Sequence, residues 1–247
     1  MNRPGWRRPP SWRLFALRLV HLNVGLMVFG LSIAFMLAAN IGLGPWDVFH
    51  QGVAQRTPLT IGQAMVAAGL ALLIVSALLA KVRPGVGTVL NMALIGPWVD
   101  LFLAVPGFPQ ADGGAAGWGL FVAGLVLNGF ATGLYITAGL GAGPRDGFAI
   151  GLATLLGTQV RRARTLVEVV VLATGWALGG TVGLGTLAFA AGIGPLMQAG
   201  LRSLRGVEQA YAAASDRARP VDRAAARAET LREPAREPVR DPLDEPA

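Results

Sequence analysis

The sequence has no cysteine among its 247 residues, which excludes disulfides, thiolate metal sites and cysteine nucleophiles. Charge is scarce too, since 14% of the residues are charged, whereas a soluble domain carries about 25%. The two histidines, His21 and His50, have no partner at a metal-ligand spacing. We therefore expect no metal site and no cofactor, and a protein adapted to a solvent other than water.

Apolar residues dominate, at 53% of the chain, and they gather in long runs. A hydrocarbon layer about 30 Å thick requires about 20 consecutive apolar residues per helix. Six runs approach this length: 22–39, 59–80, 86–105, 115–138, 165–178 and 184–201. The sequence therefore predicts an all-α polytopic membrane protein with six transmembrane helices, in contact with the lipid bilayer.

Two phrases occur twice along the chain. "GLGPWDVF" (42–49) returns as "GAGPRDGF" (141–148), and "GVGTVL" (85–90) returns as "GLGTLA" (183–188). These echoes divide the chain into two units, 20–105 and 115–205, joined by an outer loop at 106–114. Because each unit has three spans, the second unit must be inverted relative to the first, which predicts an inverted 3+3 repeat.

Charge supports a cytoplasmic location for both ends of the chain. Twelve of the thirteen Lys and Arg residues before residue 204 fall on the side of the basic N-terminus (1–19), and Arg56 is the exception. The segment 206–247 is rich in Ala, Arg, Glu and Pro, and we expect a disordered cytoplasmic tail with at most a short helix to about Ala214. Residues 204–247 carry eight Arg and nine acids, so the positive excess lies beside the spans and indicates no nucleic-acid partner.

Each Gly-x-Gly-Pro-x-Asp phrase has the features of a helix start. Proline is favoured at the first helical position, and an acid nearby faces the positive end of the helix dipole. The backbone of the motif comprises Gly42, Gly44, Pro45, Gly141, Gly143 and Pro144. The following helices are too short to cross a membrane, so they are expected to be amphipathic at the interface or re-entrant.

Inverted repeats with Gly- and Pro-interrupted segments point to a substrate or ion site at the repeat interface. The candidate binding residues are Trp46, Asp47, Arg145, Asp146 and Glu168. Two simpler interpretations stay open: the aspartates only cap their helices, and Glu168 only pairs with Arg164.

The matched "IGP" triplets place Pro97 and Pro195 inside the third and sixth spans, where proline kinks a helix. Paired kinks suit a gating element, although proline is also tolerated in membrane helices for other reasons. We expect no catalytic residue and no enzyme. A paired-aspartate protease needs two adjacent carboxylates, and the inverted topology brings Asp47 and Asp146 in from opposite sides.

The phrases "NIGLGPWDVFHQG", "GVGTVLNMALIGPWVDLFL", "GLGAGPRDGFAIGLA" and "GTVGLGTLAFAAGIGPLMQ" resemble those of the bacterial YczE/YitT-type integral membrane proteins. The resemblance covers about residues 20–205. It implies a multispan protein of the bacterial cytoplasmic membrane and supplies neither a reaction nor a substrate.

The leading hypothesis is a transporter or exporter of a small molecule or ion. The alternative is a membrane scaffold or accessory protein that supports a partner complex, with the repeated phrases purely structural. The oligomeric state is left open, with a homodimer as one arrangement.

Overall fold

The computed structural model describes residues 12–80, 84–141 and 143–217, and every regular element in these ranges is an α-helix. The all-α prediction is confirmed for this part of the chain. Residues 1–11 of the predicted basic N-terminus and residues 218–247 of the predicted tail lie outside the described residues, as does the side chain of Asp146.

Five described helices are long and apolar enough, judged by length and composition alone, to cross a membrane. They are α1 (Trp12–Ala39), α3 (Ile61–Ala80), α4 (Val86–Leu103), α5 (Gly114–Thr137) and α8 (Leu184–Ser203). The predicted runs match these helices to within a few residues, except that α1 begins ten residues before the run at 22–39. Apolar runs of this length therefore located the spans but not the helical extension of the first one.

The fifth predicted span is not confirmed. It corresponds to α7 (Val160–Ala177), which begins five residues before the predicted run at 165–178. The extra turn brings in Arg161, Arg162 and Arg164, which together with Glu168 make four charged residues in an 18-residue helix. Such a helix falls below the apolar composition of the other five.

The two repeated phrases open two short helices, as the sequence predicts. They are α2 (Pro45–Arg56) and α6 (Pro144–Leu155), each 12 residues long with proline at its first position. Gly44 and Gly143 precede them in nearly identical extended conformations, with φ of −65° and −63°. A 12-residue helix is about 18 Å long, so neither can cross a bilayer.

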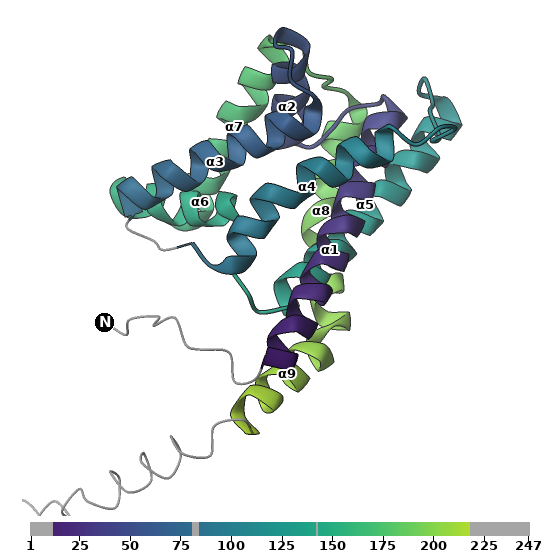
Figure 1. The fold of residues 1–247 in the computed structure, drawn as a ribbon. Helices are drawn as coiled ribbons and strands as arrows, with labels where there is room; N and C mark the ends of the chain where they lie inside the picture. Colours follow the sequence, from purple (N-terminus) through teal and green to yellow (C-terminus); the bar gives the residue numbers. More distant parts are fainter. Residues whose placement is uncertain (1–11, 81–83, 142, 218–247) are drawn as a thin grey trace, which may run out of the picture.

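The helices pack into two connected groups (Figure 1). Each group contains helices from both repeat units, and corresponding helices of the two units make corresponding contacts. The first group is built on α1 and α5, with α4 against α1 and α8 against α5. In the second group α2 packs on α7 and α3 packs on α6. Exchanging the two units (α1 with α5, α2 with α6, α3 with α7, α4 with α8) converts each of these contacts into another of the set.

One contact breaks this pattern. Helices α3 and α4 pack closely because Gly62 and Gly96 bring their backbones together, and the Asp100 carboxylate accepts hydrogen bonds from the Thr60 hydroxyl and the Gly62 N–H at 2.5 and 2.9 Å. In the second unit Arg161 stands where the first has Gly62. In the described part of the chain α7 and α8 do not pack in this way.

A ninth helix, α9 (Arg205–Arg217), follows α8 and folds onto the beginning of α1 (Figure 1). The Arg18 guanidinium donates to the Tyr211 carbonyl at 3.0 Å and to the Ser215 hydroxyl at 2.9 Å. It also lies 5.2 Å from the centre of the Tyr211 ring. The helix predicted to reach about Ala214 therefore continues to Arg217, and it is held by tertiary contacts.

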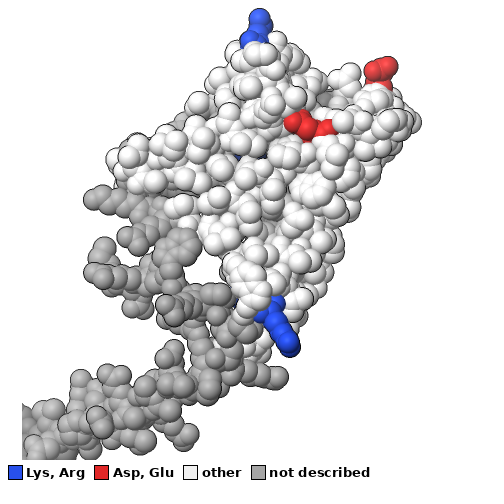
Figure 2. Space-filling model, in the orientation of Figure 1, with Lys and Arg blue, Asp and Glu red and all other residues white. Residues whose placement is uncertain are grey.

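The core lies where α1, α4 and α5 meet, around Leu22, Leu26, Met36, Val99 and Phe121. The outer surfaces of the long helices expose large apolar side chains. On the face drawn in Figure 2, charged residues are few and lie toward the ends of the molecule. An apolar exterior of this kind is the one expected for helices in lipid.

Candidate functional site

Each repeated phrase packs against the start of a long helix in the other unit. The segment before α2 packs on the start of α8, where the Gly185 N–H donates to the Ile41 carbonyl at 2.9 Å. The Leu43 N–H donates to the Thr186 hydroxyl at 3.2 Å. The segment before α6 packs on the start of α4 in the corresponding manner, with the Gly87 N–H donating to the Leu140 carbonyl at 2.8 Å. The two phrases and the two Gly-x-Gly-Thr helix starts recur together because they bind each other crosswise.

Two glycines allow this crosswise seating. Gly42 and Gly141 occupy the same place in the two phrases and have φ of +120° and +128°, a region that strongly favours glycine. A Cβ on Gly42 would lie 2.8 Å from the Gly183 nitrogen, and one on Gly141 would lie 3.0 Å from the Thr88 hydroxyl. Backbone conformation and close approach therefore both require glycine here.

The starts of α2 and α6 meet inside the protein. The Arg145 guanidinium carbon lies 4.9 Å from the centre of the Trp46 ring, within the range of a cation–π contact. These two residues hold the same position in the two phrases. Trp46 and Arg145, which precede Asp47 and Asp146, are therefore in contact. The predicted approach of the two phrases from opposite sides does not keep the phrases apart, so it is no argument against a pair of carboxylates.

A cavity of about 260 Å³ lies where the helix starts converge. Both phrases line it, through Gly44, Pro45, Trp46, Asp47, Gly143, Pro144 and Arg145. The other walls come from α1, α3, α4, α5, α7 and α8 and include Asn91, Asn128 and Tyr135. The structure thus brings together four of the five predicted binding residues, namely Trp46, Asp47, Arg145 and Glu168.

Asp47 forms a buried pair with His50, one turn further along α2. Their side chains are 7% and 2% exposed, and Asp47 Oδ1 lies 3.8 Å from His50 Nδ1. Neither of these two atoms has a hydrogen-bond partner. Burial lowers the pKa of the His50 imidazole, and the positive charge of Arg145 acts in the same direction, whereas Asp47 opposes both. The carboxylate oxygen nearest His50 is therefore not used as a helix cap.

His50 is not among the predicted binding residues, because its spacing in the sequence suggests a role only as a metal ligand, for which it lacks partners. The relevant signal is the i, i+3 spacing in "DVFH", which places both side chains on one face of a helix. In the described ranges no group of three or more acidic or histidine side chains is arranged to hold a metal ion. The pair is thus a feature of two residues, without a third ligand.

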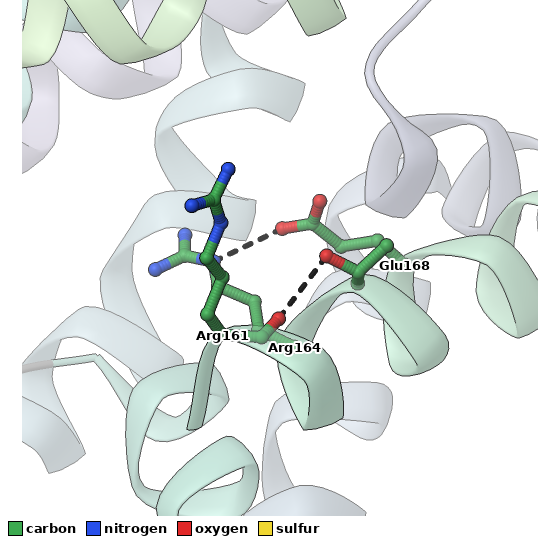
Figure 3. Close-up of polar contacts among 4 residues, drawn as sticks. Arg161, Arg164 and Glu168 are labelled. Atoms are coloured by element: carbon green, nitrogen blue, oxygen red, sulfur yellow. Dashed lines mark hydrogen bonds and ion pairs between the residues drawn. The ribbon is translucent and has the colours of Figure 1, made fainter. Parts of the chain in front are cut away.

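Glu168 pairs with Arg164, as the simpler interpretation of the sequence predicts (Figure 3). The Arg164 Nε donates to Glu168 Oε1 at 3.1 Å, and the two side chains are 51% and 41% exposed. Both residues line the cavity. The pair therefore lies at a more accessible part of the cavity than Asp47 and His50.

The paired prolines lie beside the same cavity. Pro97 and Pro195 are inside α4 and α8, as predicted. Ile95 and Gly96, just before the first proline, and Ile193, just before the second, contribute to the cavity wall. A change in either helix at its proline would therefore alter the shape of the cavity.

Residues 16–201 match DUF6198, which is described as a family of unknown function. The chain belongs to this family. The DUF6198 match contains both repeated phrases and both Gly-x-Gly-Thr helix starts, and it ends before α9. The residues that build the cavity therefore lie within the family's common region.

Relatives of this DUF6198 chain occur in different bacteria. It is 34% identical over 163 residues to the uncharacterized membrane protein YczE of Bacillus subtilis, covering 66% of this chain and 74% of the relative. It is 33% identical over 196 residues to an uncharacterized protein of Haemophilus influenzae, covering 79% and 88%. No solved structure matches it. The DUF6198 chain is therefore a YczE-type membrane protein.

Proposed function

We propose that this protein is a transporter or exporter of a small molecule or ion, with its site at the interface of two inverted units. One observation carries the proposal: both helix starts open into one cavity that holds charged residues between apolar walls. Helix starts that converge from two repeats are the arrangement by which many transporters form a central site. Apolar walls with a few placed polar groups are typical of small-ligand sites.

The proposed inversion is supported by the packing and by the charges. Apart from the contact between α3 and α4, the main contacts of the two units exchange with one another as a two-fold axis between α1 and α5 requires. The distribution of Lys and Arg favours an N-terminus and a C-terminus on the cytoplasmic side of a bacterial membrane.

We further propose that α7, at the position of the fifth predicted run, also crosses the membrane and completes the set of six spans. Its 18 residues correspond to about 27 Å, close to the hydrocarbon thickness. Its charged residues all lie in the first half of the helix, at the end assigned to the cytoplasm. Arg164 and Glu168 line the cavity and form an ion pair with each other, so neither places an unpaired charge in the lipid.

The alternative function is a scaffold or accessory protein, and the packing of each phrase against the other unit supports it. That seating alone accounts for the repeated glycines without any substrate. We propose no catalytic activity in either case.

Alternating access separates the two functions, and the lack of cysteine makes it measurable. Ala149 is buried and lines the cavity. We expect Ala149→Cys to react with a membrane-impermeant thiol reagent both from outside intact cells and from the cytoplasmic side of inverted vesicles. Labelling is irreversible, so even a state populated at about 1% accumulates product.

Ala153→Cys is the matched control, because Ala153 is equally buried on the next turn of α6 and does not line the cavity. It should react from neither side. Reaction of Ala149→Cys from a single side, or from neither, would contradict the transporter and favour the scaffold.

A further inference from the structure

We propose that Asp47 and His50 form a proton-binding site in the cavity and that the coupling ion of the transport cycle is a proton. This inference rests on the proposed transport function for its second part only. Proton binding by the pair is a property of the folded protein that can be measured without any substrate.

The geometry places two unsatisfied polar atoms beside each other at the cavity. Asp47 and His50 are 5% and 2% exposed, and both line the cavity. Asp47 Oδ1 and His50 Nδ1 are 3.8 Å apart and lack hydrogen-bond partners. Buried polar atoms normally have such partners, so a pair without them indicates a place for a small ligand.

A proton is the ligand that fits two atoms at this separation. A shift of less than 1 Å would bring the oxygen and nitrogen to hydrogen-bond distance with the proton between them. A metal ion would need further ligands, and no group of three suitable side chains exists in the described ranges. A bound proton also offsets the charge of a buried carboxylate, which is costly without a partner.

The charged groups around the pair come from two other helices. Helix α3, which packs on α2, carries no ionisable residue. Helix α6 contributes Arg145, whose positive charge acts on His50, and Asp146, whose side chain lies outside the described part. Helix α7 contributes Arg164 and Glu168, which pair with each other at 3.1 Å. Among these described groups, the positive charge of Arg145 acts against protonation of His50.

Only one of the two units carries the pair. The position that corresponds to His50 in the second unit is Ala149. A symmetric cavity with one proton site is sufficient for coupling, because a single group exposed to each side in turn can bind and release a proton.

The first test is a nitrogen-15 NMR titration of histidine in the full chain in detergent. The two histidines give two pairs of ring-nitrogen signals, and a His21→Asn variant assigns them. We expect the His50 signal to titrate, and Asp47→Asn to weaken its proton affinity roughly tenfold or more, because a carboxylate at this distance favours the protonated imidazole. The His21 signal should not move with Asp47→Asn.

A His50 signal that stays neutral down to pH 4, or one whose midpoint ignores Asp47→Asn, would overturn the proton site. Coupling is tested separately with Ala149→Cys. The ratio of outside to inside labelling should change with pH, and Asp47→Asn should abolish that change. If His50 titrates but Ala149→Cys labels from one side only, the transport function fails while the proton site stands. If Ala149→Cys labels from both sides with no pH dependence, proton coupling fails while transport stands.

Discussion

At the scale of single residues, Gly42 and Gly141 allow each repeated phrase to pack against the other unit. Gly42 and Gly141 stand out because they recur at one offset, and the structure supplies the reason in their positive φ and close contacts. His50 was overlooked because its role depends on burial beside Asp47. A single sequence shows spacing directly, whereas burial follows from packing among distant helices.

Replacing Gly42 with alanine should destabilise the protein. The methyl group would meet the Gly183 and Thr186 nitrogens at 2.8 Å, and the backbone would be strained at φ of +120°. Strain and overpacking of this kind cost about 1–3 kcal/mol. The midpoint of thermal unfolding in detergent should fall by roughly 2–10 °C.

Gly194→Ala is the matched control. Gly194 lies in α8, and no atom lies within 4 Å of a Cβ built there. Its unfolding midpoint should stay within about 2 °C of the unmodified chain. An equal loss of stability in both variants would show that the seating of the first phrase is not what requires Gly42.

At the scale of elements, α9 shows where composition misleads. The segment after residue 205 is polar and has few large apolar residues, so composition predicts little structure. The docking depends on one aromatic and one hydroxyl side chain, Tyr211 and Ser215, which meet Arg18 nearly 200 residues earlier in the chain. A contact between such distant positions has no local signal.

Replacing Arg18 with glutamine should release α9 from α1. The variant loses charge-assisted hydrogen bonds to Tyr211 and Ser215, which contribute about 1.5–3 kcal/mol in typical cases. Backbone amides of α9 should then exchange with deuterium roughly 10–100 times faster. Arg13→Gln, on the exposed part of α1, should leave α9 unchanged. Equal exchange in the Arg18 variant would mean that α9 is held by other contacts.

At the scale of the whole molecule, most helices could be predicted and their pairing could not. Hydrophobic runs and proline positions set the bounds of the helices, since both act locally. The crosswise seating joins Leu43 to Thr186, 143 residues apart, and the repeats only hint at it. The predicted span at 165–178 is not confirmed, because the helix there begins at Val160 and includes Arg161, Arg162 and Arg164, so it is less apolar than the five candidate spans.

The inverted arrangement can be tested at two corresponding sites away from the cavity. Thr57 follows α2 and Leu156 follows α6, and both are exposed. We expect Thr57→Cys to react with an impermeant thiol reagent on intact cells, and Leu156→Cys to react only after the membrane is opened. Reaction of both from the same side would exclude an inverted repeat.

The crosswise seating also sets an order of events during synthesis. Gly87, which binds the second phrase, is synthesised before that phrase. The first phrase binds Thr186, which is synthesised 143 residues after Leu43. At about 5–20 residues per second, this delay is roughly 7–30 s. Throughout that time the first three helices are in the membrane, and the start of α2 lacks its contact with α8. A ribosome that stops before α8 therefore leaves a half-built protein whose cavity lacks a wall, and the quality-control machinery of the cell has a long interval in which to recognise it.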